Sequence, residues 1–478
     1  MLGDKEFKPK MFYSVQLDEL VPQDHELRRV LSSVDFSFIR GIVSNKYSRT
    51  GQPSVDPEVI IKMLFIGYYY GILSERQLVK NIQTDMAYRW FLGYDIDEKV
   101  PTHSVLSKAR QRYGTEVFQS IFDRIVEQCI KAGLVGGRQA FMDSTIIEAD
   151  ASENSLVPRL KVLEPNQYVK YIMAGEKVND RKVSKTDPDA TLHKKRGSTK
   201  AKLSYKGHHL VDGKKRIIVA ASATDSISRS DCESKPLILQ TQFRHNLKFK
   251  SFCADSEYGT QSLYHFLISG NITPYIAPQL PHKKPNPFAK DAFSYESEQD
   301  VYICPAGKKL IRSRYNPAKK QNEYCQAERG QCRDCAMKQG CTPNRGSRII
   351  QRLLYQEDVD RGRELAKTNE YKSQMKKRKH VLESLFGEAK EFHGLRRARF
   401  RGLERIKMQV LWTATVLNIK KLMRNTTGAR KAAAAFLDAY AGQKHQTLTI
   451  ISNFYIRLSK NVDFFLREIF PELEPVGR

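Results

Sequence analysis

The sequence predicts an α/β protein in which an all-α N-terminal region precedes a region of mixed strands and helices. Three observations predict this class. Apolar residues recur at helical spacing through the first 130 residues, β-prone runs occupy 138–148 and 203–221, and helical periodicity returns after residue 356. A chain of 478 residues is long enough for roughly two to four domains.

The first 130 residues favour several short helices. One is expected to begin at Pro57 and to carry an apolar run as far as Tyr70. Residues 74–77 have the form of a capping box. Apolar residues at four-residue spacing follow and predict a single helix: Leu78, Ile82, Met86 and Trp90. Another helix is expected over 105–112, and its basic residues suit either a helix-turn-helix module or a bundle with a solvated face.

The middle of the chain favours strands. Residues 138–148 are β-prone, and side chains alternate along a strand, so Asp143 and Glu148 are expected on opposite faces. Residues 203–221 predict a hairpin in which Asp212 and Gly213 form a two-residue turn. Another strand is expected over 247–254, and helices are expected over 356–393 and 404–423.

The charge of the chain points to a polyanionic partner. Lys and Arg number 80 against 53 Asp and Glu, a formal charge of +27. Because basic side chains that neutralise phosphates release counterions, nucleic acid is favoured over an anionic membrane surface. The first residues lack the apolar core of a signal peptide, and the apolar run before Tyr70 is too short to span a bilayer. We therefore expect a cytoplasmic, nucleoid-associated protein with no membrane partner.

Three carboxylates are candidates for a magnesium site. Asp143 lies inside a predicted strand, Asp255 follows another strand and precedes a glycine turn, and Glu383 lies beside an apolar helix stripe with Gly387 and Lys390 on its own face. Carboxylate oxygens are the ligands that Mg²⁺ prefers, and phosphoryl transfer on DNA commonly uses two such ions. Each residue also has an ordinary interpretation: a solvated strand aspartate, a helix N-cap and a surface helix glutamate.

Two basic runs are candidates for phosphate contact. Arginine forks bind phosphate in a bidentate manner, so the first run suits DNA better than a solvated loop does. It comprises Arg396, Arg397, Arg399 and Arg401. The second run suits sequence-neutral backbone contact or a solvated, mobile segment equally well. It comprises Lys194, Lys195 and Arg196.

Five of the eight cysteines fall between 304 and 341, which points to a local structure. Cys332 and Cys335 form one CxxC pair. With Cys341 and either Cys304 or Cys325, this pair could hold a structural zinc ion; the alternative is a set of free thiols. The set predicted here is Cys304, Cys332, Cys335 and Cys341.

In order along the chain, several motifs resemble those of the DDE transposases of bacterial insertion sequences, in particular the group usually numbered 1182. In the N-terminal region they are 47–57, 71–78 and 87–93, and further on they are 142–145, 254–259 and 383–402. The resemblance implies catalytic roles for Asp143, Asp255 and Glu383. Relatives often carry Tyr and Arg at seven and four residues before the glutamate, whereas this chain has Lys376 and Lys379 there.

The resemblance implies a ribonuclease-H-like catalytic core with a Cys-containing insertion, and DNA cleavage with strand transfer at two Mg²⁺ ions, which Mn²⁺ could replace. The partners would be the element ends and target DNA, with a homo-oligomer pairing two ends. Phosphate contacts would come from Arg378, Lys379 and Lys390. A metal-dependent nuclease without strand transfer and a domesticated, non-catalytic DNA-binding protein remain alternatives. The expected domains are 1–130 (DNA-binding), 138–275 with 356–425 (catalytic), 276–350 (insertion) and 426–478 (helical tail).

Overall fold

The computed structural model describes residues 16–48, 50–158, 182–194, 197, 199–278, 288–342 and 346–441, with side chains as far as residue 425 in the last range. These residues belong to two compact units. The first draws on Met1–Ser228, Pro236–Lys248 and His380–Arg478, and the second on Arg229–Lys235 and Phe249–Lys379. The boundary falls inside two helices, α9 (Ser230–His245) and α13 (Asn369–Phe392).

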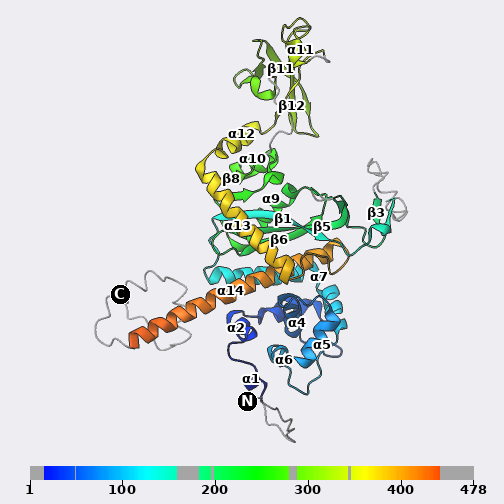
Figure 1. Ribbon diagram of the computed structural model, residues 1–478, viewed down its shortest axis with the longest axis vertical. Coiled ribbons are helices and arrows are strands. Elements are labelled where there is room, and N and C mark those ends of the chain that lie inside the picture. Colours follow the sequence, from blue (N-terminus) through cyan, green and yellow to red (C-terminus); the bar gives the residue numbers. More distant parts are fainter. Residues whose placement is uncertain are drawn as a thin grey trace, which may run out of the picture. The chain divides into compact units, whose positions relative to one another are not determined.

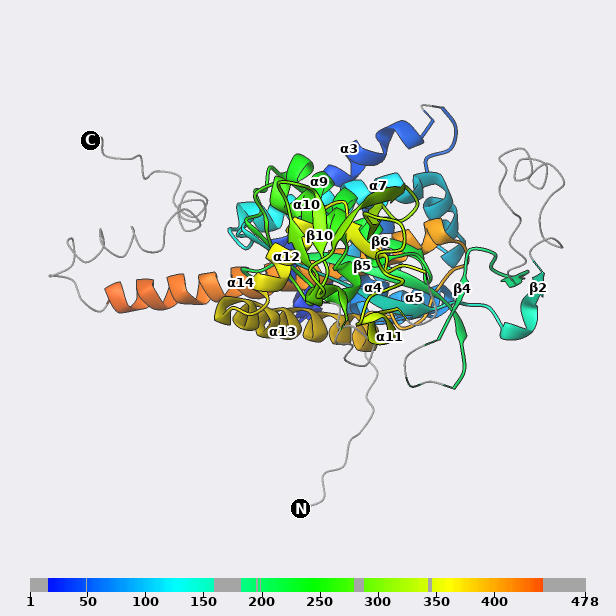
Figure 2. The same ribbon diagram turned by 90° about the horizontal axis from the view of Figure 1, so that it is seen from above.

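The N-terminal part of the first unit is helical, as predicted, and is drawn in blue and cyan in Figure 1. Its helices are α1 (Leu17–Leu20), α2 (Glu26–Ser33), α3 (Phe38–Val43), η1 (Ser44–Lys46), α4 (Pro57–Tyr69), α5 (Glu75–Thr84), α6 (Met86–Leu92) and α7 (His103–Lys131). Helix α4 begins at Pro57 as expected, because Asp56 accepts a hydrogen bond from the backbone N–H of Glu58. Helix α3 packs against α7 (Figure 2).

The helix predicted across the four-residue apolar stripe is in fact two helices. Ser74 caps α5 as expected, since its Oγ accepts from the N–H of Gln77 at 3.3 Å. At Asp85 the backbone turns extended (φ −95°, ψ 115°), and the Asp85 carboxylate accepts from the N–H of Tyr88 to begin α6. The prediction of one helix is wrong because the N-cap at Asp85 interrupts it, and Met86 is left 49% exposed.

The helix expected over 105–112 is the start of a much longer element. Helix α7 continues to Lys131, with a kink at Gly114, where φ is +64°. Only glycine adopts this backbone conformation without strain, so the kink follows from the residue type. The buried side of α7 includes Phe118, Ile121 and Ile125.

The sheet of the first unit is antiparallel. Strand β5 (Lys202–Asp212) pairs with β1 (Gln139–Glu148), β4 (Thr191–His193) and β6 (Ile218–Asp225), and β2 (Leu156–Pro158) pairs separately with β3 (Lys182–Ser184). The predicted strand and hairpin are therefore present. The two-residue turn is wrong: Asp212 stays in β5, and residues 213–217 connect it to β6.

A buried carboxylate explains the wider turn. Asp212 is 1% exposed, and its side chain accepts from the backbone N–H groups of Gly136, Gly137 and Lys214 at 2.9, 2.8 and 2.9 Å. Three donors to one carboxylate satisfy the buried charge. This aspartate therefore ties the segment before β1 to the turn after β5.

Helix α14 (Leu403–Ala441) is the apolar helix expected over 404–423, and it packs against α7 and β6. Its Trp412 is 2% exposed and meets the rings of Tyr68 and Phe118 edge-on. Asn418 bonds both the N–H and the carbonyl of Ile218 in β6, at 2.9 and 2.7 Å. The helix thus joins the N-terminal helices to the sheet. Beyond Ala441, the helical tail expected over 426–478 lies outside the described residues.

The second unit contains a parallel strand pair and its connecting helices. Strand β7 (Ser251–Ala254) leads through η4 (Ser256–Tyr258) and α10 (Gln261–Ser269) to β8 (Thr273–Ile276). Helix α12 (Gln356–Leu365) and the first part of α13 follow later in the chain. The expected strand therefore ends at Ala254, directly before Asp255.

The same unit holds a five-stranded antiparallel sheet in the order β13-β12-β11-β10-β9. Its elements are η5 (Lys290–Ala292), β9 (Ser294–Glu296), β10 (Val301–Ile303), β11 (Lys309–Asn316), β12 (Gln321–Gln326), α11 (Lys338–Cys341) and β13 (Ile350–Leu353). Its buried cluster comprises Phe293, Tyr302, Leu310, Tyr324 and Ile350. Among the described residues of both units, no helix is long and apolar enough to cross a bilayer.

Candidate active site

Asp143 lies in the middle of β1, directly across the strand pair from His209 in β5. Directly opposite residues share a face of the sheet, so the Asp143 and His209 side chains lie on one face. A Cβ built on Gly207, two residues away in β5, would meet Ile147 and Val410 on that face. Helix α14 therefore covers the face that carries Asp143. The carboxylate accepts from the backbone N–H of Ser144 at 2.8 Å and is partly exposed.

His209 is fully buried opposite Asp143, and among the described residues neither ring nitrogen has a hydrogen-bond partner. Burial lowers the pKa of His209 to about 3, and the charge of Lys421 adds to this effect. The ring is therefore neutral at physiological pH. Sequence analysis did not single out this residue as part of a site, because its environment comes from strand pairing and not from local sequence.

Glu383 lies on the part of α13 that belongs to the first unit. Phe386, three residues further on, places its ring 5.1 Å from the ring of His209. Residues three apart lie on neighbouring positions of one helix side, so this packing brings the Glu383 side of α13 toward the Asp143 face. Glu383 is exposed, whereas Leu382 and Leu385 are buried as the stripe predicted.

Arg216, which sequence analysis did not single out, contacts α13 beside Glu383. It follows the β5 turn with φ +60°, a strained value for a residue with a Cβ. Its guanidinium donates to Ser384 Oγ at 3.1 Å and to His380 Nε2 at 3.2 Å, on either side of Glu383 in the sequence of α13. Lys421 donates to its carbonyl. No local signal could have found it, since its partners lie more than 160 residues away in the chain.

The part of α13 after Glu383 is held by an ion-pair network. Lys420 on α14 pairs with Glu388 and lies 3.2 Å from His393 Nε2, while His393 Nδ1 lies 2.8 Å from the carbonyl of Tyr68. Hydrogen bonding from His393, and then from Lys420, lowers the pKa of Glu388 to about 2. This network fixes α13 against α14 and α4 within the first unit.

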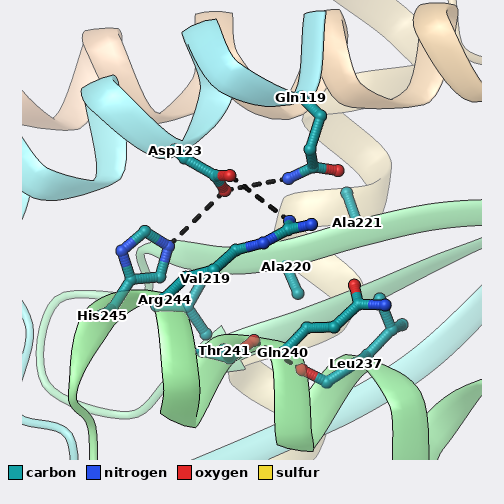
Figure 3. A pocket seen from close by; sticks show the side chains of 10 residues that line it. All are labelled: Gln119, Asp123, Val219, Ala220, Ala221, Leu237, Gln240, Thr241, Arg244 and His245. Carbon is teal, nitrogen blue, oxygen red and sulfur yellow. Dashed lines mark hydrogen bonds and ion pairs between the residues drawn. The ribbon is translucent and has the colours of Figure 1, made fainter. Parts of the chain in front are cut away.

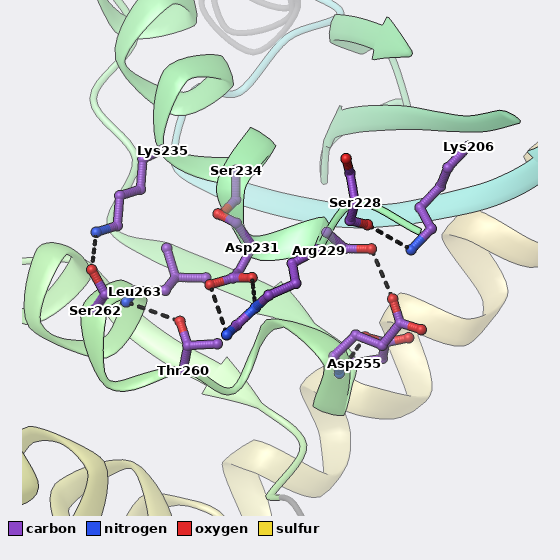
Figure 4. Close-up of polar contacts among 12 residues, drawn as sticks. Lys206, Ser228, Arg229, Asp231, Ser234, Lys235, Asp255, Thr260, Ser262 and Leu263 are labelled. Atoms are coloured by element: carbon purple, nitrogen blue, oxygen red, sulfur yellow. Dashed lines mark hydrogen bonds and ion pairs between the residues drawn. The ribbon is translucent and has the colours of Figure 1, made fainter. Parts of the chain in front are cut away.

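Asp255 belongs to the second unit, directly after β7. Its carboxylate accepts from the N–H of Glu257 at 2.9 Å and so caps η4, the ordinary interpretation of this residue. Arg378 on α13 places Nη2 3.9 Å from Asp255 Oδ2. Figure 4 shows Asp255 in a polar region of this unit, in which Arg229 also pairs with Asp231. At 39% side-chain exposure, Asp255 is open to solvent and remains a candidate ligand.

The predicted basic residues are dispersed. Arg396 pairs with Glu391, and both Arg397 and Arg401 pair with Asp150 at 3.1 and 3.4 Å, all on the surface of the first unit. Arg399 lies over the ring of Tyr68, 3.8 Å from its centroid. Lys194 and Lys379 are exposed and Lys390 is partly exposed, whereas Lys195 and Arg196 lie outside the described residues. The phosphate-binding roles of this set stay predictions.

A polar hollow lies elsewhere in the first unit, between α7, β6 and the end of α9 (Figure 3). The Asp123 carboxylate accepts a hydrogen bond from Gln119 Nε2 at 2.8 Å and forms an ion pair with Arg244 at 3.3 Å. His245 Nε2 lies 3.6 Å from Asp123 Oδ1. The cavity of about 10 Å³ has room for about one water molecule. This cluster is therefore an internal ion pair and not a ligand site.

The four predicted zinc ligands lie together in the second unit. Cys304, Cys332, Cys335 and Cys341 line one cavity, and Cys325 does not. In the described ranges taken as a whole, no group of three or more His, Cys, Asp or Glu side chains is already arranged to hold a metal ion. Magnesium binding at the carboxylates and zinc binding at the cysteines therefore stay predictions.

Comparison with known proteins gives two family matches. A family described as a transposase domain (DUF772) matches residues 15–112, which span α1 to the start of α7. A family described as a transposase DDE domain matches residues 303–423, from the end of β10 into α14. Glu383 lies inside the second match, whereas Asp143 and Asp255 lie outside both. The comparison with curated proteins finds no match.

Among solved structures, the cryo-EM structure of a piggyBac transposase synaptic complex with hairpin DNA aligns over 89% of this chain and 81% of that chain. The identity is 9% and the TM-score is 0.31, a value too low to establish a shared fold. The two family matches carry the assignment. Both describe transposases, they occur in the order that the motifs predicted, and they are consistent with a DDE transposase of an insertion sequence.

Proposed function

We propose that the protein is a DNA transposase that cleaves the ends of an insertion sequence and joins them to target DNA, with Asp143, Asp255 and Glu383 as its catalytic carboxylates. The observation that carries the proposal is the position of Glu383. It lies inside the DDE-domain match, on a helix whose Phe386 packs on the cross-strand partner of Asp143.

Helix α13 contacts a candidate residue in each unit. Within the second unit Arg378 pairs with Asp255, and within the first unit Phe386 contacts His209. Arg378 and Phe386 belong to one helix, and Glu383 lies between them in the sequence. We propose Asp255 as the third carboxylate because its motif resembles the second aspartate motif of the family and because its side chain, directly after β7, is open to solvent.

The proposed core is ribonuclease-H-like and covers 138–275 and 356–425, with 276–350 as a Cys-containing insertion. The antiparallel strands β1, β5 and β6, followed in the chain by the parallel pair β7 and β8 and by the helices α13 and α14, support this architecture. The N-terminal helices would contribute DNA binding, since the matched family there is also a transposase domain.

The donor chemistry fits divalent cations. All three carboxylates reach solvent, and carboxylate oxygens are the ligands that Mg²⁺ and Mn²⁺ accept in proteins. When bound, two such ions would favour the attacking oxygen and steady the leaving oxygen of the phosphodiester. The neighbouring His209 is buried and does not reach solvent, so it does not compete for this role at Asp143.

The basic side chains would hold the DNA backbone. Arg216 is anchored by two hydrogen bonds beside Glu383, and its fixed fork suits a phosphate next to the scissile bond. Arg378, Lys379 and Lys390 lie on the same helix as Glu383 and would contact adjacent phosphates. Positioning of this kind accounts for much of the catalysis of phosphoryl transfer.

The test uses labelled duplexes that carry the two ends of the encoding element with flanking DNA. Asp143→Asn, Asp255→Asn and Glu383→Gln should each reduce Mg²⁺-dependent cleavage by on the order of 10⁴-fold while end binding in a gel shift is retained. Glu391→Gln is the matched control, a second exposed glutamate of α13, and should cleave normally.

Pre-cut ends with a free 3′-hydroxyl separate the alternatives. Joined product in the presence of target DNA supports a transposase, and cleavage without joining indicates a metal-dependent nuclease. Binding without either activity indicates a non-catalytic DNA-binding protein. Cleavage that persists in all three amide variants would remove the carboxylates from the mechanism.

A further inference from the structure

Four cysteines line one small cavity in the second unit. The cavity has a volume of about 30 Å³, and the cysteines are Cys304, Cys332, Cys335 and Cys341. The first cysteine directly follows β10, the next two lie in the loop after β12, and the last ends α11. Three separate chain segments therefore bring four thiols to one place, although only two of the thiols form a CxxC pair.

The turn at Cys304 places a backbone N–H against its sulfur. The backbone N–H of Lys308 points to Cys304 Sγ at 3.3 Å, while Cys304 N–H donates to the carbonyl of Lys308 at 2.9 Å. Gly307 makes this tight turn possible with φ +71°, and its N–H donates to the carbonyl of Cys304 at 2.8 Å. A hydrogen bond to a ligand atom fixes its orientation, so this turn holds the Cys304 sulfur beside the cavity.

The charge around the cavity suits a dication held by four thiolates. Such a centre carries a net charge of about −2, and three basic side chains line the same cavity, namely Lys308, Lys338 and Arg348. These basic side chains would offset the negative charge of four thiolates around one ion.

The five-stranded sheet around this cavity has a small apolar core. Its buried cluster contains five side chains, and Cys304 and Cys341 pack against that cluster. A core this small seldom stabilises a sheet alone, and natural proteins of such size add a metal or disulfides. All eight cysteines are free in this structure.

We propose that Cys304, Cys332, Cys335 and Cys341 bind one structural Zn²⁺ that joins the β10–β11 turn, the loop after β12 and α11. Zn–S bonds of about 2.3 Å require the thiols to close on the cavity when the ion binds. The ion stabilises the five-stranded sheet and takes no part in the reaction at Asp143 and Glu383. The proposal is independent of the proposed function, because its test involves no DNA.

Full-length protein purified under reducing conditions without chelator should contain one zinc ion per chain by mass spectrometry of the metal. Cys335→Ser should lower the zinc content by at least about tenfold, because three thiolates bind Zn²⁺ far less tightly than four. Cys325→Ser is the matched control. Its thiol is on strand β12, lies 3.8 Å from the carbonyl of Gln326 and does not line the cavity, so zinc should be retained.

A second measurement uses the wild-type chain and does not depend on whether a variant folds. Replacement of zinc by Co²⁺ should give the charge-transfer and visible bands of a tetrahedral thiolate site. Alkylation followed by peptide mass spectrometry should find four cysteines protected until a chelator is added. Wild-type protein without zinc and without cobalt bands overturns the proposal, and so does equal loss of zinc in the Cys325 and Cys335 variants.

Discussion

The two sheets of the molecule differ in how they are stabilised. In β5 of the first unit every residue except Lys202 is buried, because helices cover the sheet. In β11 of the second unit only Leu310 is buried. The first sheet therefore depends on a large apolar core, while the second depends on a few aromatic residues and, in our proposal, on a metal. The difference indicates that buried apolar side chains suffice for the first sheet, whereas the second, in our proposal, requires a metal cross-link as well.

The largest effect is expected from Trp412→Ala. Trp412 joins α14 to α4 and α7 through edge contacts with Tyr68 and Phe118, so its removal leaves a large cavity. The free energy of unfolding of the first unit should fall by about 3–5 kcal/mol. Hydrogen exchange followed by mass spectrometry should place the loss in β5, β6 and α14. Trp90 is partly exposed, so Trp90→Ala should lower the free energy of unfolding by less. Equal losses in the two variants would contradict the central position of Trp412 in this core.

Leu310→Ala tests the other sheet. Leu310 is 1% exposed in a five-residue cluster, and its truncation should cost about 2–4 kcal/mol, enough to unfold a sheet with so small a core. Hydrogen exchange should rise across β9–β13, and less so when zinc is present. The neighbouring Ile311 is 43% exposed, so Ile311→Ala should change stability by less than about 0.5 kcal/mol. A loss confined to β11 alone would show that the sheet does not behave as one unit.

Asp212→Ala should cost the first unit about 2–3 kcal/mol, because three backbone N–H groups lose their buried acceptor. Chemical denaturation measures the loss, and exchange at Gly136 and Gly137 should increase first. Lys215→Ala in the same turn is exposed and should change the free energy by no more than about 0.5 kcal/mol. If the two variants are equally stable, the carboxylate does not hold the turn.

The smallest expected effect is a pH dependence at Glu388. Its pKa falls from 4.5 to about 2 on folding, so the stabilisation is complete above the unfolded value and is lost as pH falls through about 2. Glu388 is half-buried, and after allowance for solvent screening the effect is about 1–2 kcal/mol. Thermal unfolding of wild type and Glu388→Gln should differ at pH 5.5 and converge toward pH 2. If the difference in unfolding temperature between the two proteins does not change with pH, the ionisation of Glu388 is not its cause.

Local signals allowed much of the first unit to be predicted. The cap at Ser74, the start of α4 at Pro57 and the strand around Asp143 follow from residue types next to one another in the chain. The break at Asp85 had a local signal, an N-cap residue, but the apolar periodicity around it obscured that signal. The wide turn after Asp212 depends on Gly136 and Gly137, which are about 75 residues away.

The site was only partly predictable for the same reason. Sequence spacing selected Glu383, but its relation to the Asp143 face depends on the contact between Phe386 and His209. Arg216 was missed because its hydrogen bonds to α13 are purely tertiary. The five-stranded sheet was missed because its strands are short and mostly exposed, so they lack the alternation of apolar and polar residues that identifies longer strands.

The imidazole of His209 has a consequence for enzymology. With a pKa near 3 it carries no proton across the range in which a cell operates, so it neither screens the Asp143 carboxylate nor supplies acid to a leaving group. The acid limb of a rate profile should consequently report the carboxylates themselves, with no inflection between pH 5 and 8 from this ring.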